Sequence, residues 1–303
     1  MPQLYEGQLK LGRYQLQLGN YDAAVEQFRG VLSQEPNQAE AHALLALALT
    51  NLGRLKAAEH EARCALELEP GEDFHYYILA VVLADAGRWK EAGQLVETAL
   101  GMFPYNAAYF TLLSHILRNQ GKLAEAEEAA RRALELDPED DRANLQLGHA
   151  LEEQQRHEES QQAFANALRA APEDADAHNG MGLNCLRQQQ PDRALEHFRE
   201  ALRLEPNHEG AHHNLVLAMG AKNWFYGLFW RWTLFLWRFP QNIRLAIVLG
   251  LWFAFHVNQE LVRQFPGYRM WGAVVGCAYL LFVIYSWVAD PLFRWYVQRQ
   301  RRF

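Results

Sequence analysis

Cysteine is scarce in this chain of 303 residues, which contains only Cys64, Cys185 and Cys277. The three are widely separated, so the sequence has no paired spacing for a disulfide framework or a structural zinc site. We interpret them as reduced, structural thiols. The first twenty residues also lack an apolar segment of the secretory type. We therefore expect the N-terminal part to stay in the compartment in which it is made.

Acidic residues are nearly absent from the end of the chain. Residues 223–303 contain 2 of the 36 Asp and Glu residues but 9 of the 29 Lys and Arg residues, a net charge of +7. Residues 1–222 have a net charge of −14, and 8 of the 9 Trp residues follow them. An acidic soluble part is thus joined to a basic, aromatic and apolar tail. Because a phosphate backbone binds basic surfaces, we expect the acidic part to have no nucleic-acid partner.

Internal repetition dominates residues 1–221. Prolines recur at steps of 34 residues, at Pro36, Pro70, Pro104, Pro138, Pro172 and Pro206. Glycines recur with the same period, at Gly19, Gly53, Gly87 and Gly121. A fixed period of this length indicates a solenoid of repeated two-helix units. The units are 5–38, 39–72, 73–106, 107–140, 141–174 and 175–208, and a half unit follows at 209–221.

Residues 39–72 show how one unit is built. Apolar residues at helical spacing predict a first helix over 39–52. Gly53 ends that helix because glycine readily adopts the left-handed backbone found at helix C-termini. A second helix is predicted over 56–69, and Pro70 cannot continue it. Each unit is therefore a helical hairpin closed by a proline.

Small residues recur where the two helices of a unit must approach closely, for example Gly12 and Gly148, and large residues such as Phe28 fill the space between units. The chain resembles the tetratricopeptide repeat family over residues 5–221. The matching residues of the first unit are Leu11, Gly12, Gly19, Tyr21, Ala24, Phe28 and Pro36. The resemblance implies an all-α fold, a right-handed superhelical solenoid of six and a half helix pairs. It also implies recognition of a protein or peptide on the concave surface.

Units five and six depart from the family pattern at the turn between their helices. Gln155 and Gln189 stand where the other units have glycine. Pro191 then falls in the first turn of the following helix, where a missing N–H costs little. We expect local irregularity at these turns rather than a break in the array.

The tail predicts a transmembrane helical hairpin over residues 243–303. Residues 270–289 contain no charge over twenty positions, which is enough to cross a hydrocarbon core of ~30 Å at ~1.5 Å per residue. Residues 243–261 form a second predicted span if Arg244 reaches the interface, and a re-entrant or interfacial helix is the alternative. Gly272 and Gly276 have a spacing that allows close approach of a partner helix.

Residues 222–242 predict an interfacial amphipathic helix ahead of the first span, because Trp prefers the headgroup zone and Arg pairs with anionic lipid. A transmembrane helix is the alternative, made costly by Arg231 near its middle. Basic residues are more frequent on both sides of the hairpin than in its loop, so we expect both ends in the cytoplasm. The layout resembles a group of bacterial membrane-anchored repeat proteins, which implies an integral protein of the inner membrane.

The sequence contains no recognisable catalytic constellation: no phosphate loop, GxSxG or HExxH. His208 and His212 have a spacing that can bind metal, but no Cys is nearby, and His212 shares its repeat position with His42 and His178. We interpret these histidines as packing and surface residues, and His256 in the first predicted span as structural. We therefore predict no enzymatic activity, no catalytic residue, no metal, no cofactor and no small-molecule substrate.

The concave surface is the remaining candidate site. The resemblance implies that the first helix of each unit lines it, with mainly apolar positions in units one to three and mainly polar ones in units four to six. Partial burial against neighbouring helices is the alternative role for the apolar set. The Lys/Asn clamp that some relatives use for chaperone C-termini is not reproduced, which disfavours that ligand. The predicted groove residues are Leu9, Arg13, Leu47, Phe74, Tyr77, Val81, His115, Asn119, Arg142 and His149.

These observations predict a membrane-anchored interaction scaffold or adaptor, with the repeats facing the cytoplasm. A protein or peptide ligand would bind the groove, and membrane lipid would surround the tail. The alternative is an accessory or assembly subunit of a membrane enzyme or transporter, contacted mainly through the tail. An enzyme hidden in the tail is disfavoured, because the tail offers no set of acid, base or metal ligands.

Overall fold

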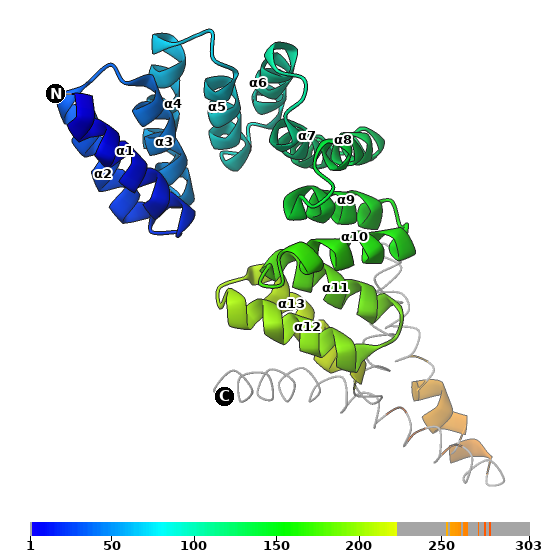
Figure 1. The fold of residues 1–303 in the computed structure, drawn as a ribbon. Helices are drawn as coiled ribbons and strands as arrows, with labels where there is room; N and C mark the ends of the chain where they lie inside the picture. The colour runs from blue at the N-terminus through cyan, green and yellow to red at the C-terminus, as the bar shows by residue number, and fades with distance from the viewer. Residues whose placement is uncertain are drawn as a thin grey trace. The chain divides into compact units, whose positions relative to one another are not determined.

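The computed structural model describes residues 2–222 and, beyond them, residues 253, 255–261, 263–265, 272, 276 and 279. The chain divides into two compact units, 1–184 and 185–303. Over residues 2–222 the regular structure consists of thirteen α-helices (Figure 1). They are α1 (Pro2–Gln17), α2 (Tyr21–Gln34), α3 (Ala39–Asn51), α4 (Leu55–Leu68), α5 (Asp73–Asp85), α6 (Trp89–Met102), α7 (Ala107–Asn119), α8 (Leu123–Leu136), α9 (Asp141–Glu153), α10 (His157–Ala170), α11 (Ala175–Arg187), α12 (Pro191–Leu204) and α13 (Glu209–Lys222).

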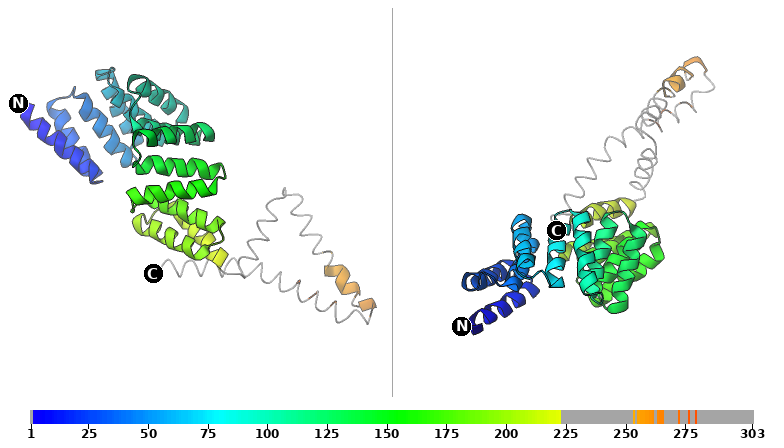
Figure 2. Two further views of the ribbon diagram at one scale, coloured as in Figure 1. Left: turned by 45° about the vertical axis from the view of Figure 1, so that its right-hand side comes forward. Right: turned by 90° about the horizontal axis from the view of Figure 1, so that it is seen from above.

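The helices pair as the 34-residue period predicts. In the first unit, α1 packs on α2, α3 on α4, α5 on α6, α7 on α8 and α9 on α10. Each of α2, α4, α6 and α8 also packs on the helix that follows it, so the pairs stack one beside the next (Figure 2). In the second unit, α12 packs on α13. The predicted helix pairs are therefore confirmed from α1 to α10, and α3 and α4 match their predicted ranges to within one residue.

The turns inside the helix pairs all use left-handed backbone. Gly53 has a φ of 70°, as the repeat pattern predicts, and the other three turn glycines are similar. Gln155 and Gln189 adopt the same conformation, with φ of 64° and 60°. The predicted irregularity at these turns is thus confined to residue type, because both glutamines take the glycine conformation and the helices continue on either side.

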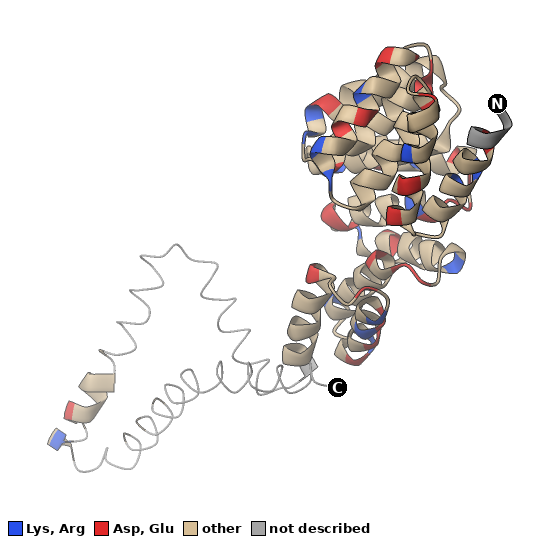
Figure 3. Ribbon diagram, turned by 90° about the vertical axis from the view of Figure 1, so that its left-hand side faces the viewer, with Lys and Arg blue, Asp and Glu red and all other residues tan. Residues whose placement is uncertain are grey.

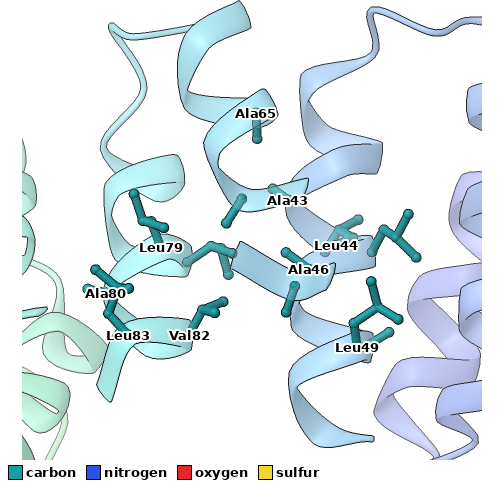
Figure 4. Close-up of a cluster of buried hydrophobic side chains, with 14 of the residues drawn as sticks. Ala43, Leu44, Ala46, Leu49, Ala65, Leu79, Ala80, Val82 and Leu83 are labelled. Carbon is teal, nitrogen blue, oxygen red and sulfur yellow. The ribbon is translucent and has the colours of Figure 1, made fainter. Parts of the chain in front are cut away.

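Small residues let the helices interlock around large ones. A Cβ atom placed on Gly12 would lie 2.5 Å from Cε1 of Phe28. Phe164 is enclosed in the same way, since a Cβ on Gly148 or on Gly180 would lie 2.6 Å from its ring. Figure 4 shows alanine and leucine side chains meeting in the same manner in the core around α3 and α5.

One large residue of the family pattern, Leu11, lies at the surface. Leu45 and Leu79, in the second and third repeats, are each 2% exposed, but Leu11 at the equivalent position of the first repeat is 44% exposed. The reason is positional: in the part of the chain that the structure describes, no repeat precedes α1, so Leu11 has no neighbouring helix to pack against.

The predicted interfacial helix (222–242) and the predicted spans (243–261 and 270–289) lie mostly outside the described residues. No helix in the described part of the chain is long and apolar enough to cross a bilayer. The described residues of the tail contact one another: Asn258 donates a hydrogen bond of 3.0 Å from Nδ2 to the carbonyl of Gly272. The rings of Phe255 and Tyr279 stack with centroids 4.4 Å apart. These residues of the two segments therefore lie side by side.

Candidate functional site

A groove of about 770 Å³ lies within residues 1–184. Its walls come mainly from the first helices of six successive repeats, namely α1, α3, α5, α7, α9 and the first turn of α11, together with Tyr21 at the start of α2 and the two aspartates that precede α9 and α11. This is the surface expected from the repeat geometry. The lining residues are Leu16, Gln17, Tyr21, Leu47, Thr50, Asn51, Tyr77, Val81, Asp85, Ala108, Thr111, Leu112, His115, Asp140, Arg142, Leu145, Gln146, Asp174 and Asp176.

Five of the ten predicted groove residues line it. They are Leu47 on α3, Tyr77 and Val81 on α5, His115 on α7 and Arg142 on α9. The structure therefore brings together residues from four repeats that are separated by as many as 95 positions in the sequence.

The other five predicted residues lie outside the groove lining. Leu9 is 8% exposed and belongs to the hydrophobic core, and Phe74 packs against the same core. Arg13 forms an ion pair with Glu40. The side-chain amide of Asn119 donates to the backbone carbonyl of His115 on its own helix, at 2.8 Å. The ring of His149 meets the ring of Phe164 edge-on, with centroids 5.1 Å apart.

Tyr77 forms a fixed part of the apolar wall. Its ring stacks on that of Tyr109 in the next repeat, with centroids 4.9 Å apart. Tyr109 is itself held by a hydrogen bond of 2.5 Å from its hydroxyl to Oδ2 of Asp73. Burial raises the pKa of Tyr77 above its ordinary value. The phenol therefore stays neutral near pH 7 and presents a rigid aromatic surface to the groove.

Sequence reasoning missed the aspartates of the groove: Asp85, Asp140, Asp174 and Asp176. A signal for one of them was present, because Asp85 occupies the repeat position of Asn119, which was among the predicted groove residues. Asp140 and Asp174 directly precede a first helix, at the predicted turn between repeats, and Asp176 lies in the first turn of α11. The groove lining has one basic side chain that is charged near pH 7, Arg142, against these four acids.

Two of these aspartates also cap helices. Oδ1 of Asp140 accepts a hydrogen bond of 3.1 Å from the backbone N–H of Ala143, and Oδ1 of Asp174 accepts one of 2.7 Å from Ala177. Asn106 caps α7 from the equivalent position, which shows that an amide can do the same task in this chain. The second carboxylate oxygen of Asp140 accepts a hydrogen bond of 3.1 Å from the Thr111 hydroxyl.

The groove shifts the pKa of several of its titratable groups. Partial desolvation of the carboxylate raises the pKa of Asp85, although the residue is exposed. Burial also raises the pKa of Asp174, and the negative charge of Asp176 adds to the increase. Burial lowers the pKa of His115, and the nearby Arg118 adds to that effect. His115 is therefore neutral near pH 7 and does not balance the charge of the carboxylates.

The histidines considered for metal binding make structural contacts. Nε2 of His42 lies 2.9 Å from the carbonyl of Pro36, and Nε2 of His212 lies 2.8 Å from that of Pro206. Tyr76, at the same repeat position, donates a hydrogen bond of 3.3 Å to the carbonyl of Pro70. This position ties a first helix to the preceding proline turn. Nδ1 of His208 accepts from the backbone N–H of Ala211 at 3.3 Å.

A second hollow, of about 840 Å³, lies among α6, α7 and α8. Its charged side chains are largely paired with one another or with close neighbours. Arg131 lies 2.8 Å from Glu127, Arg132 pairs with Glu135, and Glu125 lies 3.3 Å from Lys122. Three of its glutamates are therefore already engaged in ion pairs, although five glutamates of the lining still outnumber its two arginines. Figure 3 shows such acidic and basic positions close together on the helices of the repeats.

The sequence model of the tetratricopeptide repeat family matches residues 9–73, 111–160 and 145–209, and a second model of the same repeat matches 74–98. No curated protein matches the chain significantly.

Several solved structures are similar in fold. The Cut9–Hcn1 hetero-tetramer of APC/C matches at a TM-score of 0.65 and 21% identity, over 72% of this chain and 43% of that one. The human IFIT1 dimer with PPP-AAAA matches at 0.61 and 20%, over 71% and 57%. Pseudomonas aeruginosa pilF matches at 0.54 and 22%, over 69% and 95%. These similarities concern the fold of the repeats alone.

Proposed function

Because the chain belongs to the tetratricopeptide repeat family, we propose that it is a membrane-anchored scaffold that holds an extended segment of a partner protein in its groove. Proteins of this family generally mediate protein–protein interactions. The observation that carries the proposal is the groove itself, which combines an apolar wall with exposed hydrogen-bonding groups along six repeats.

The groove suits an extended peptide for a physical reason. Such a peptide carries unpaired backbone N–H and C=O groups as well as side chains. Asn51 and Gln146 line the groove, and each amide keeps donors and acceptors beyond its one bond within the protein, to the carbonyl of Leu47 and to the ring of His115 respectively. Leu47, Tyr77 and Val81 supply a surface on which an apolar side chain can be buried. Binding of this kind needs both features within reach of one segment.

The membrane part of the proposal rests on the tail sequence. Residues 270–289 contain no charge, and basic residues flank the apolar segments. The contacts of Asn258 with Gly272 and of Phe255 with Tyr279 support a hairpin. The proposed topology places both termini in the cytoplasm, in a bacterial inner membrane.

Cysteine labelling tests the topology. In a variant without the three native cysteines, a single cysteine near Pro266 should react with an impermeant reagent added to intact cells. A single cysteine near Phe303 should react only after the cells are opened. Labelling near Phe303 from outside would contradict the hairpin.

Groove substitution tests the binding role. The full chain in detergent should recover its partner from a membrane extract, and Tyr77→Ala should lose at least ~30-fold in affinity, the typical cost of truncating an aromatic anchor. Leu79→Ala is the matched control, since Leu79 is a core residue on the same helix that does not line the groove. It should lower the melting temperature and retain the partner below that temperature.

The competing role, an accessory subunit contacted through its tail, gives the opposite pattern. A partner retained by Tyr77→Ala but lost on deletion of residues 223–303 would favour that role and refute the groove as the binding site.

A further inference from the structure

We infer that the groove selects a basic partner segment, whose Lys or Arg side chains meet Asp85, Asp140, Asp174 and Asp176 while an apolar side chain packs on Tyr77. This inference rests on the proposed function and adds the chemistry of the partner. It concerns a peptide of another protein, recognised by charge and by one apolar anchor.

The charge balance of the groove is the first argument. Its four aspartates face one arginine, and His115 is neutral near pH 7. The repeats as a whole have a net charge of −14 over residues 1–222. A concave acidic surface with low-dielectric walls concentrates its field and attracts cations. The same field would repel an acidic ligand.

Asp85 gives the second argument, because the fold does not account for it. It is the last residue of α5, where the partial negative charge of the helix end disfavours an acid. Neighbouring groups partly desolvate its carboxylate and raise its pKa, and no cation or hydrogen bond acts in the opposite direction. Asp85 is exposed at the groove, so a ligand cation can reach its carboxylate and would offset the unfavourable charge at the helix end.

The aspartates of the last repeats give a third argument. The caps that Asp140 and Asp174 provide require an acceptor atom but no charge, as Asn106 shows. Asp174 and Asp176 repel each other, which adds to the raised pKa of Asp174. A cation bound between them would relieve this repulsion.

The apolar anchor lies close to these charges. Both Asp140 and Arg142 act electrostatically on the hydroxyl of Tyr77, which places them near that ring. A segment with an aliphatic or aromatic residue next to Lys or Arg therefore fits the wall and the acids together. Arg142 is the one cation of the lining. It repels the Lys or Arg side chains of such a ligand and donates hydrogen bonds to acceptor groups of the ligand that lie nearby.

A peptide array provides the test. The full-length chain in a nonionic detergent is incubated with immobilised ten-residue peptides of random sequence. The bound peptides should be enriched in Lys and Arg next to aliphatic or aromatic residues. The basic tail of the chain repels basic peptides. Binding of peptides to the tail would therefore not produce the expected enrichment in Lys and Arg.

Substitutions then assign the bound peptide to the groove. Asp140→Asn and Asp174→Asn keep the helix caps, and each should weaken the best peptide about fivefold, as for one surface ion pair. Arg142→Gln should tighten it about threefold. Asp137→Asn is the matched control, because Asp137 is an exposed acid three residues from Asp140 outside the groove, and it should leave the affinity unchanged.

The outcomes separate this inference from the proposed function. Neutral or acidic peptides whose binding is abolished by Tyr77→Ala would overturn the basic specificity and leave the groove as the site. Basic peptides that respond neither to Tyr77→Ala nor to the Asp→Asn pair would bind elsewhere and overturn both. An array with no bound peptide would also overturn both.

Discussion

Nη1 of Arg156 donates a hydrogen bond of 2.6 Å to Oε2 of Glu127, a residue of the preceding repeat. The same contact occurs two repeats earlier, where Nη1 of Arg88 donates to Oε1 of Glu59 at 2.7 Å. Burial alone would raise the pKa of Glu127, but hydrogen bonds from Gln154, Arg131 and Arg156 lower it overall. The side chain of Glu127 is only 13% exposed. Adjacent repeats are therefore joined by ion pairs as well as by apolar packing.

Arg156→Gln should lower the free energy of unfolding, because it leaves a largely buried carboxylate with one cation fewer. The lowered pKa of Glu127 means that this contribution is present above its ordinary value of 4.5 and is lost as the pH falls through the folded-state value. Thermal unfolding at a series of pH values measures it. Arg132→Gln is the control, since its exposed pair with Glu135 lies within one helix and should contribute under ~0.5 kcal/mol. Equal losses in the two variants would show that the link between repeats adds no stability.

Gly148→Ala should destabilise the repeats by about 1–3 kcal/mol, because the new methyl group would overlap the ring of Phe164. Gly101→Ala provides a control of opposite sign. Gly101 also lies in a helix, but a Cβ atom placed on it would have no other atom within 4 Å, so the substitution should stabilise by about 1 kcal/mol through helix propensity alone. Denaturant unfolding of the two variants should give midpoints on either side of the wild-type value. An unchanged unfolding midpoint for Gly148→Ala would mean that Phe164 repacks without a cost in stability.

Gln155→Gly should stabilise the chain by about 1 kcal/mol, because glutamine is held in a left-handed conformation that glycine adopts without strain. The reciprocal change Gly121→Gln should destabilise by a similar amount. No atom lies within 4 Å of a Cβ on Gly121, so its penalty comes from the backbone. Shifts of the same sign in the two variants would contradict this account. The melting temperature followed by far-UV circular dichroism measures both.

Asp85→Asn should weaken the binding of a basic peptide and raise the melting temperature at pH 7 only slightly, because Asp85 is exposed and water screens its carboxylate. A folded-state pKa above the ordinary 3.8 means that the neutral form is the stable one, and that stability is lost as the pH rises through the folded-state pKa. The stabilisation by asparagine should therefore disappear below about pH 3.8. Paired melting curves and peptide titrations check the two effects. A variant that is less stable at pH 7 would show that the ionised carboxylate has a structural partner.

The repeat could be read from the sequence alone. Pro70 and Gly53 delimit helices through local backbone rules, and Gly148 opposite Phe164 is readable because the same small and large positions recur at each step. These features depend on contacts within one unit or between neighbours in the chain. A fixed period therefore predicts them without any coordinates.

The set of side chains that share the groove emerged only from the folded chain. Leu9 and Tyr77 occupy equivalent repeat positions, yet Leu9 is in the core and Tyr77 lines the groove, because the first repeat has different neighbours. The sequence pattern places Asp140 and Asp174 in the turns between repeats. They become part of the acidic lining only because α9 and α11 bring them to the same surface. Such a surface depends on the rotation between successive repeats, and that rotation arises from packing summed over many residues.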